Sequence, residues 1–171
     1  GAHDPNTGKT LLCCNDEELV PIDILYGMAM KQLIIIDACR TPVQVELIKA
    51  ASRGFGLLAE TGDPFYAMSC RNLFDRYLSM SEYGLTIVHS CGIGQEAGAS
   101  DNGGGIFTQM LISASRAWLS AVEHGSQSVL TIRKAFGSVK QGMGLEPRLR
   151  RQVPELEEGR RIYSFPLAVA P

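Results

Sequence analysis

Two short runs of apolar residues constrain the fold of this chain more than any other feature. The first, "QLIIID", covers residues 32–37, and the second, "LTIVHS", covers residues 85–90. Neither run alternates apolar with polar residues in its centre, which is typical of parallel strands covered on both faces. We therefore expect two neighbouring parallel strands in the interior of a sheet.

Segments with helical spacing surround these strands. Apolar residues recur three or four positions apart in residues 43–60 and 106–125, and helices are also expected from about Ile22 and within residues 128–144. A last strand is predicted in "RIYSFPLAVA", residues 161–170. This alternation predicts an α/β domain with a mostly parallel sheet flanked by helices, and 171 residues suit one such domain.

Charge and cysteine usage narrow the classes of partner. The 16 basic and 18 acidic residues are scattered and give a net charge of −2, so nothing indicates a surface for nucleic acid or for an anionic membrane. No apolar run approaches the ~20 residues of a membrane span. We expect a cytoplasmic protein with protein, peptide or small-molecule partners. The five cysteines include no CxxC pair, so neither a disulfide framework nor a metal site is predicted.

The first strand ends by presenting a thiol between two charges, in "IIIDACR". Reactive groups collect at the carboxyl ends of parallel strands, and Cys39 follows such an end. A lone cysteine is usually an inert, small apolar side chain. Asp37 and Arg40, however, both need solvent or partners, and one local alternative pairs them with each other. Cys39 is therefore a candidate nucleophile.

"IIIDACR" resembles the nucleophile strand of the caspase-like cysteine peptidases, the clan of caspases, paracaspases, metacaspases and their bacterial relatives. "IVHSCGIGQEAGASDNGGGIFTQML" is similar to the clan's next strand, loop and helix, and "RRQVPELEEGRRIYSFPL" is similar to its C-terminal ending. These motifs stand in the clan's order across most of the chain. The resemblance implies a caspase-hemoglobinase fold over residues 1–171, and a thiol protease in which Cys39 attacks a peptide carbonyl to form a thioester.

The resemblance also implies a histidine as the base of a Cys-His dyad. In the clan this histidine follows a strand, is followed by glycine, and stands some forty or more residues before the cysteine. His3 precedes Cys39 by 36 positions and has no glycine after it. Two assignments stay open, His3 or a histidine just before Gly1, and the opening "GAHDPNTGKTLL" favours the second. The clan's first strand and helix are missing, so we expect the chain to be part of a larger protein.

The acid two positions before the nucleophile indicates specificity. By the resemblance, Asp37 lines the pocket for the residue before the scissile bond, as in metacaspases, and implies cleavage after arginine or lysine. Relatives place a second acid in the loop near Ala99, and here Asp101 is the candidate. Residues 41–83 are longer than a minimal member needs, so this region is an insertion or a processing site.

Other functions compete with proteolysis. "NTGKT" matches the end of a phosphate-binding loop, but the earlier glycine is replaced by His3. A catalytically inactive caspase-like scaffold for protein interaction is the main alternative, because the histidine is displaced. A redox protein using Cys39 and Cys91 is a third class. The resemblance implies no cofactor, leaves calcium activation open, and suggests an effector released by a sensor domain or a regulatory partner.

Overall fold

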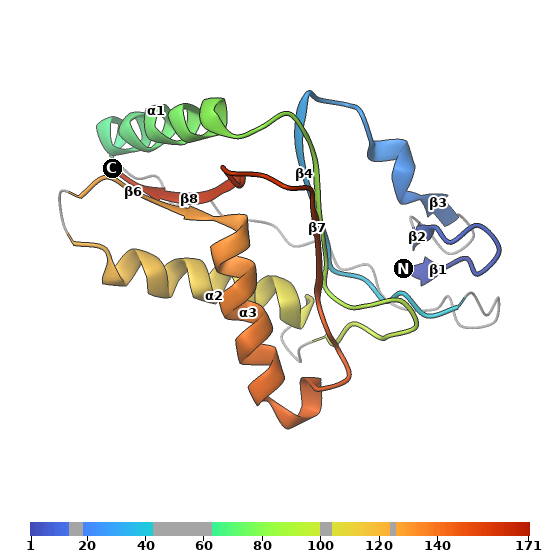
Figure 1. Cartoon of the computed structure of the whole chain (residues 1–171). Helices are drawn as coiled ribbons and strands as arrows, with labels where there is room; N and C mark the ends of the chain where they lie inside the picture. The colour runs from blue at the N-terminus through green and yellow to red at the C-terminus, as the bar shows by residue number, and fades with distance from the viewer. Residues whose placement is uncertain (14–18, 43–62, 100–103, 124–125) are drawn as a thin grey trace.

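The computed structural model describes residues 1–13, 19–42, 63–99, 104–123 and 126–171, and within them the chain is mixed α/β (Figure 1). The helices are α1 (Pro64–Met80), α2 (Ile106–Ala121), α3 (Ile132–Leu145) and two short 3-10 helices, η1 (Ile22–Leu25) and η2 (Pro147–Leu149). One small sheet consists of β1 (Ala2–His3), β2 (Thr10–Cys13) and β3 (Leu19–Pro21). A second consists of β4 (Lys31–Ile36), β5 (Gly84–His89) and β7 (Glu155–Glu158), and a third pairs β6 (Ser128–Thr131) with β8 (Pro166–Ala170).

The two predicted apolar strands pair as expected. β4 and β5 run parallel, with Ile34 opposite Ile87. The other named strands of the described chain pair antiparallel, including β7 against β5, so the sheet is mixed rather than mostly parallel. Only the β1–β2 and β2–β3 connections are short enough to require an antiparallel pair, whereas β5 and β7 pair antiparallel across a long connection. The α/β class is confirmed, while the caspase-hemoglobinase fold stays a prediction.

The position of β4 differs from the expected one. The strand is apolar on both faces, and Ile34 and Ile36 pack with Ile22 of η1 while Leu33 packs against the main core on the other face. In the strand order β4-β5-β7, however, β4 lies at the end, so no described strand pairs with its outer edge. The Ile35 side chain is 39% exposed. The sequence predicts a central strand, and the described residues place it at an edge.

The main core lies where α2 and α3 pack against β6 and β8. Phe107 of α2 is fully buried and meets Phe136 of α3 edge-to-face, with ring centroids 6.5 Å apart. α1 covers the opposite face of the β6–β8 pair (Figure 1). This packing fixes the start of α2, which lies next to the end of β4.

Several predicted boundaries need correction. The helix expected from Ile22 is only the single turn η1, because the chain turns away at Gly27, whose φ of +74° suits glycine. The segment 128–144 begins as β6 before α3 starts, since Thr131 caps that helix by accepting a hydrogen bond from the Lys134 N–H. The helix expected in residues 43–60 lies outside the described residues, as does most of the proposed insertion at 41–83; its remainder includes α1.

Candidate active site

Cys39 follows β4 by three residues and lies beside the segment that follows β5. Its side chain is half-buried. The Ala97 N–H donates to the Cys39 sulfur at 3.3 Å, and the thiol faces the Ala97 carbonyl at 3.8 Å. The sulfur therefore lies against a polar stretch of backbone at the carboxyl ends of two parallel strands, and is not enclosed in packed hydrocarbon.

Backbone hydrogen bonds join the segment that carries Cys39 to residues 90–97. The Arg40 N–H donates to the Gln95 carbonyl at 2.9 Å, and the Gly94 N–H donates to the Arg40 carbonyl at 2.8 Å. Closer to the strands, the Ser90 N–H donates to the Ile36 carbonyl at 2.8 Å. These bonds extend the β4–β5 pairing beyond both strands, and they hold Cys39 at a fixed distance from Ala97.

Two glutamines fix the other side of the same loop. The Gln95 side-chain oxygen accepts hydrogen bonds from the N–H groups of Gly92 and Val153, at 3.0 and 2.8 Å. The Gln152 side chain, 5% exposed, accepts from the Gly98 N–H at 2.8 Å and donates to the Ser90 carbonyl at 3.0 Å. Sequence reasoning missed both residues, because nothing in the local pattern marks an amide that bonds to backbone sixty positions away.

Arg40 is buried and does not pair with Asp37, so the local pairing considered from the sequence is wrong. Its guanidinium contacts Glu155 of β7 at 2.5 Å, donates to the Thr10 hydroxyl at 3.1 Å, and reaches the Cys91 carbonyl at 3.5 Å. A buried cation needs such partners. Arg40 thus joins β2, the end of β4, the end of β5 and β7 next to Cys39.

Asp37 lies at the start of α2. One of its carboxylate oxygens, Oδ2, accepts hydrogen bonds from the N–H and the hydroxyl of Thr108, at 2.9 and 2.8 Å. Residue 105 must be glycine here, since a Cβ would overlap the Asp37 carboxylate. The carboxylate thereby caps a helix N-terminus, which favours negative charge. The other oxygen, Oδ1, is buried and has no hydrogen-bond partner in the described chain.

The N-terminal strand brings Gly1 and His3 to the Cys39 segment. The His3 N–H donates to the Thr41 carbonyl at 2.7 Å. The His3 residue is 9% exposed, and its Nδ1 has no hydrogen-bond partner among the described residues. Gly1 packs against Ala38 and Cys39, where an added Cβ would lie 2.9 Å from the Cys39 carbonyl oxygen. Within the described residues, no imidazole is hydrogen-bonded to the Cys39 sulfur, so the choice of base stays a prediction.

The remaining candidates fall outside this cluster or outside the described residues. Asp101, the second candidate for the specificity pocket, lies outside the described residues, as does His124. Ala99 forms an isolated bridge with Gly105. Among the residues that the structure describes, no group of three or more His, Cys, Asp or Glu side chains is arranged to hold a metal ion, and none of the helices is long and apolar enough to cross a membrane.

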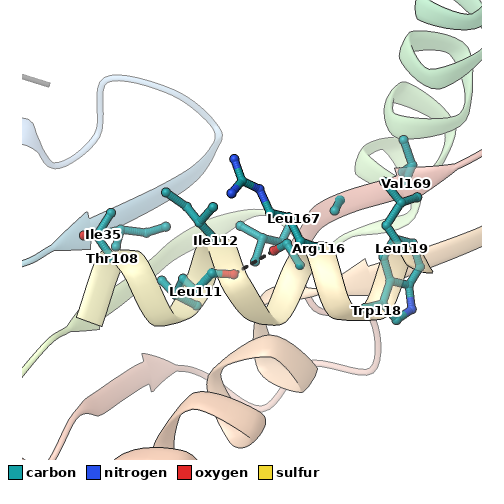
Figure 2. Close-up of a pocket in the computed structure, with 11 residues that line it drawn as sticks. Ile35, Thr108, Leu111, Ile112, Arg116, Trp118, Leu119, Leu167 and Val169 are labelled. Atoms are coloured by element: carbon teal, nitrogen blue, oxygen red, sulfur yellow. Dashed lines mark hydrogen bonds between the residues drawn. The ribbon is translucent and has the colours of Figure 1, made fainter. Parts of the chain in front are cut away.

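An apolar groove of about 510 Å³ lies apart from Cys39, between α2 and β8 (Figure 2). Ile35 of β4 and Thr108 line one end of it, and Trp118 and Val169 line the other. Thr108 connects the groove to the candidate site, because it lines the groove and also donates hydrogen bonds to Asp37. None of the residues predicted as catalytic or substrate-binding lines this groove.

His89 is a buried histidine in β5 rather than a candidate base. Its Nε2 lies 3.2 Å from the Glu157 carboxylate, whereas its Nδ1 is buried without a partner in the described chain. Burial, together with the nearby Arg40 charge, lowers the pKa of His89 from its ordinary 6.5 to about 4. The neutral imidazole is therefore the folded form at neutral pH.

We expect this histidine to make the protein less stable in acid. Between pH 6.5 and pH 4 the unfolded chain binds a proton at His89 that the folded protein does not bind. The free energy of unfolding therefore falls as pH drops through this window, by roughly 3 kcal/mol at most. Urea unfolding at pH 7.5, 6 and 5 measures the free energy of unfolding of the natural protein and of the His89→Gln variant. Equal pH dependence in both proteins would contradict the assignment.

Comparisons of the chain with protein-family models, with curated proteins and with solved structures gave no match. The caspase-like assignment therefore depends on the order of the motifs in the sequence. The described geometry adds a half-buried thiol, an acid at a helix N-terminus and a buried arginine, all at the carboxyl end of one parallel strand pair.

Proposed function

We propose that this chain is a caspase-like cysteine endopeptidase domain with Cys39 as the nucleophile. The observation that carries the proposal is the position of the sulfur, half-buried at the ends of β4 and β5 and in contact with the Ala97 backbone. A thiol so placed is held by the fold, yet remains beside loops where a peptide can bind.

The proposed reaction has two steps. The base takes the proton of the Cys39 thiol, the sulfur attacks the peptide carbonyl carbon, a C–S bond forms, the C–N bond breaks, and the leaving amine takes that proton from the protonated base. The base then takes a proton from water as the water attacks the thioester, a C–O bond forms, the C–S bond breaks, and the proton passes to the sulfur to return the thiol. The base is His3 or a histidine joined to Gly1. The contact of Gly1 with Ala38 and Cys39 places the N-terminal strand beside the Cys39 segment, which suits either assignment.

Asp37 is proposed to select arginine or lysine before the scissile bond. The support is its carboxylate, which lies two residues from Cys39 and has one oxygen, Oδ1, without a partner in the described chain. A cationic side chain placed beside this carboxylate would make a charge-assisted hydrogen bond to it. Oδ2 is already occupied by Thr108, so Asp37 would also position the start of α2.

Asp37→Asn is expected to reduce kcat/KM for arginyl peptides by about 10- to 100-fold while sparing matched glutaminyl peptides, because asparagine keeps an acceptor for Thr108 but lacks the charge. The measurement is the ratio of kcat/KM for the two peptides. Asp63→Asn is the matched control, since Asp63 caps α1 by accepting from the Phe65 N–H at 3.0 Å. An unchanged arginine-to-glutamine ratio in Asp37→Asn would refute the specificity assignment.

The second candidate is a catalytically inactive scaffold that binds proteins. One observation favours it: among the described residues the Cys39 sulfur has backbone partners and no imidazole partner. In both cases a sensor domain or regulatory partner is proposed to control the domain. The scaffold predicts that peptide hydrolysis stays absent in the natural protein under activating conditions, calcium included.

A further inference from the structure

A polar cleft of about 550 Å³ lies between residues 94–98 and the turn that follows η2. Ala97, whose backbone contacts the Cys39 sulfur, forms part of its wall, and Gln152 forms another part. Because Gln152 is buried and bonded to both Gly98 and Ser90, this wall is held in place before any ligand arrives. The volume is within the range of small-molecule and peptide sites.

The charges that line this cleft favour an anion. Arg148 and Arg151 both line it and are exposed, while Glu96 is its sole acid among the described residues. Neither guanidinium has an ion-pair partner in the described chain. Ion pairs are recorded in the described chain for Arg40 with Glu155, Arg71 with Asp75 and Arg133 with Glu158, so Arg148 and Arg151 share the lack of a partner with other exposed arginines and stand out by facing the same cleft. Arginine in a pocket matches the planar geometry of a carboxylate, which it binds through two hydrogen bonds.

The backbone of residues 95–98 offers hydrogen bonds to an extended ligand. The Gln95 carbonyl accepts from the Arg40 N–H, and Ala97 contacts Cys39, so these two residues face the Cys39 segment. Gly98 bonds instead to Gln152 and to the Ile106 N–H. In an extended chain alternate residues face opposite sides, so Glu96 faces the same side as Gly98. The N–H and C=O of Glu96 have no hydrogen bond in the described chain.

We propose that this cleft binds an extended acidic peptide. Its carboxylates pair with Arg148 and Arg151, and its backbone pairs with the free N–H and C=O of Glu96, as in strand addition. The site is separate from the chemistry at Cys39, although both share Ala97. The inference therefore does not depend on peptide hydrolysis.

Binding of a labelled peptide by the natural protein tests this inference. The probe is a fluorescein-labelled pentapeptide that alternates valine and glutamate, and its neutral match carries glutamine instead. In fluorescence anisotropy at 150 mM salt, the R148Q/R151Q double variant is expected to bind the acidic peptide at least about tenfold more weakly. The charge-matched control is R150Q/R160Q, which removes two exposed arginines outside the cleft, and its affinity should change less than about twofold.

A third variant tests whether the peptide binds in this cleft, because it should strengthen binding where the arginine variants weaken it. Glu96→Gln removes the acid of the cleft and should tighten binding of the acidic peptide by about two- to fivefold. Three results would overturn the inference: equal binding of the acidic and neutral peptides, equal losses in the two arginine double variants, or unchanged affinity in Glu96→Gln. A protein that binds the acidic peptide without cleaving any substrate would refute the proposed peptidase and leave this inference standing.

Discussion

Cys39→Ala is expected to lower kcat/KM for cleavage after arginine by ~10³-fold or more, because it removes the atom that forms the acyl-enzyme. The measurement uses the natural protein, including whatever precedes Gly1, with fluorogenic arginyl peptides in the presence and absence of calcium. Mass spectrometry after incubation with a chloromethyl ketone of arginine provides a second readout, since a covalent adduct on Cys39 requires both the thiolate and an occupied specificity pocket.

Cys70→Ala is the matched control for this experiment. Cys70 is also a free, half-buried cysteine, but it belongs to α1, and its removal should leave the cleavage rate within about twofold. Full activity in Cys39→Ala would show that another residue is the nucleophile. If neither the natural protein nor the Cys39→Ala variant hydrolyses the peptides under any activating condition, the scaffold is favoured.

Arg40→Met is expected to destabilise the folded protein by about 3–5 kcal/mol. The change removes the ion pair with Glu155, and it also leaves two deeply buried acceptors, the Thr10 hydroxyl and the Cys91 carbonyl, without their donor. The carboxylate of Glu155 is 45% exposed and can return to water, so the two buried acceptors dominate the loss. Urea unfolding, analysed with the same m value for both proteins, measures the change in the free energy of unfolding.

Arg71→Met separates this effect from the loss of any ion pair. Arg71 contacts Asp75 one helical turn away at 2.7 Å, but its side chain is 77% exposed, so its removal should leave the free energy of unfolding nearly unchanged. If Arg40→Met lowered the free energy of unfolding no more than Arg71→Met does, Arg40 would not hold together β2, β7 and the ends of β4 and β5. Loss of Cys39 reactivity toward iodoacetamide alongside the stability loss would further link Arg40 to the position of the thiol.

Hydrophobic periodicity predicted most of the elements that form the core, but not β6, which carries the buried Leu130 and was expected to be helical. β4, β5, α2 and β8 follow from apolar runs or helical spacing, because burial of those side chains dominates their local conformation. β7 has the sequence "ELEE", which no pattern marks as a strand. It is extended because its backbone pairs with β5, and that pairing depends on the tertiary fold and not on the local sequence.

The candidate site was predictable only in part, for a similar reason. The motif around Cys39 singled out Asp37 and Arg40 correctly as residues that need partners. Their partners, Thr108 and Glu155, lie 71 and 115 positions away, so no local rule finds them. The arginines of the acidic-peptide cleft carry even less signal, since "RLRR" is indistinguishable in sequence from an ordinary solvated charge cluster.

No strand of the described residues pairs with the outer side of β4, and this has a consequence for the behaviour of the protein at high concentration. The outward N–H and C=O groups of β4 form a template onto which a foreign strand can be added, and the Ile35 side chain on that border offers hydrocarbon as well. The protein should therefore aggregate more readily as its concentration rises. A lysine at position 35 is the simplest remedy, because a charge on an edge strand discourages such stacking.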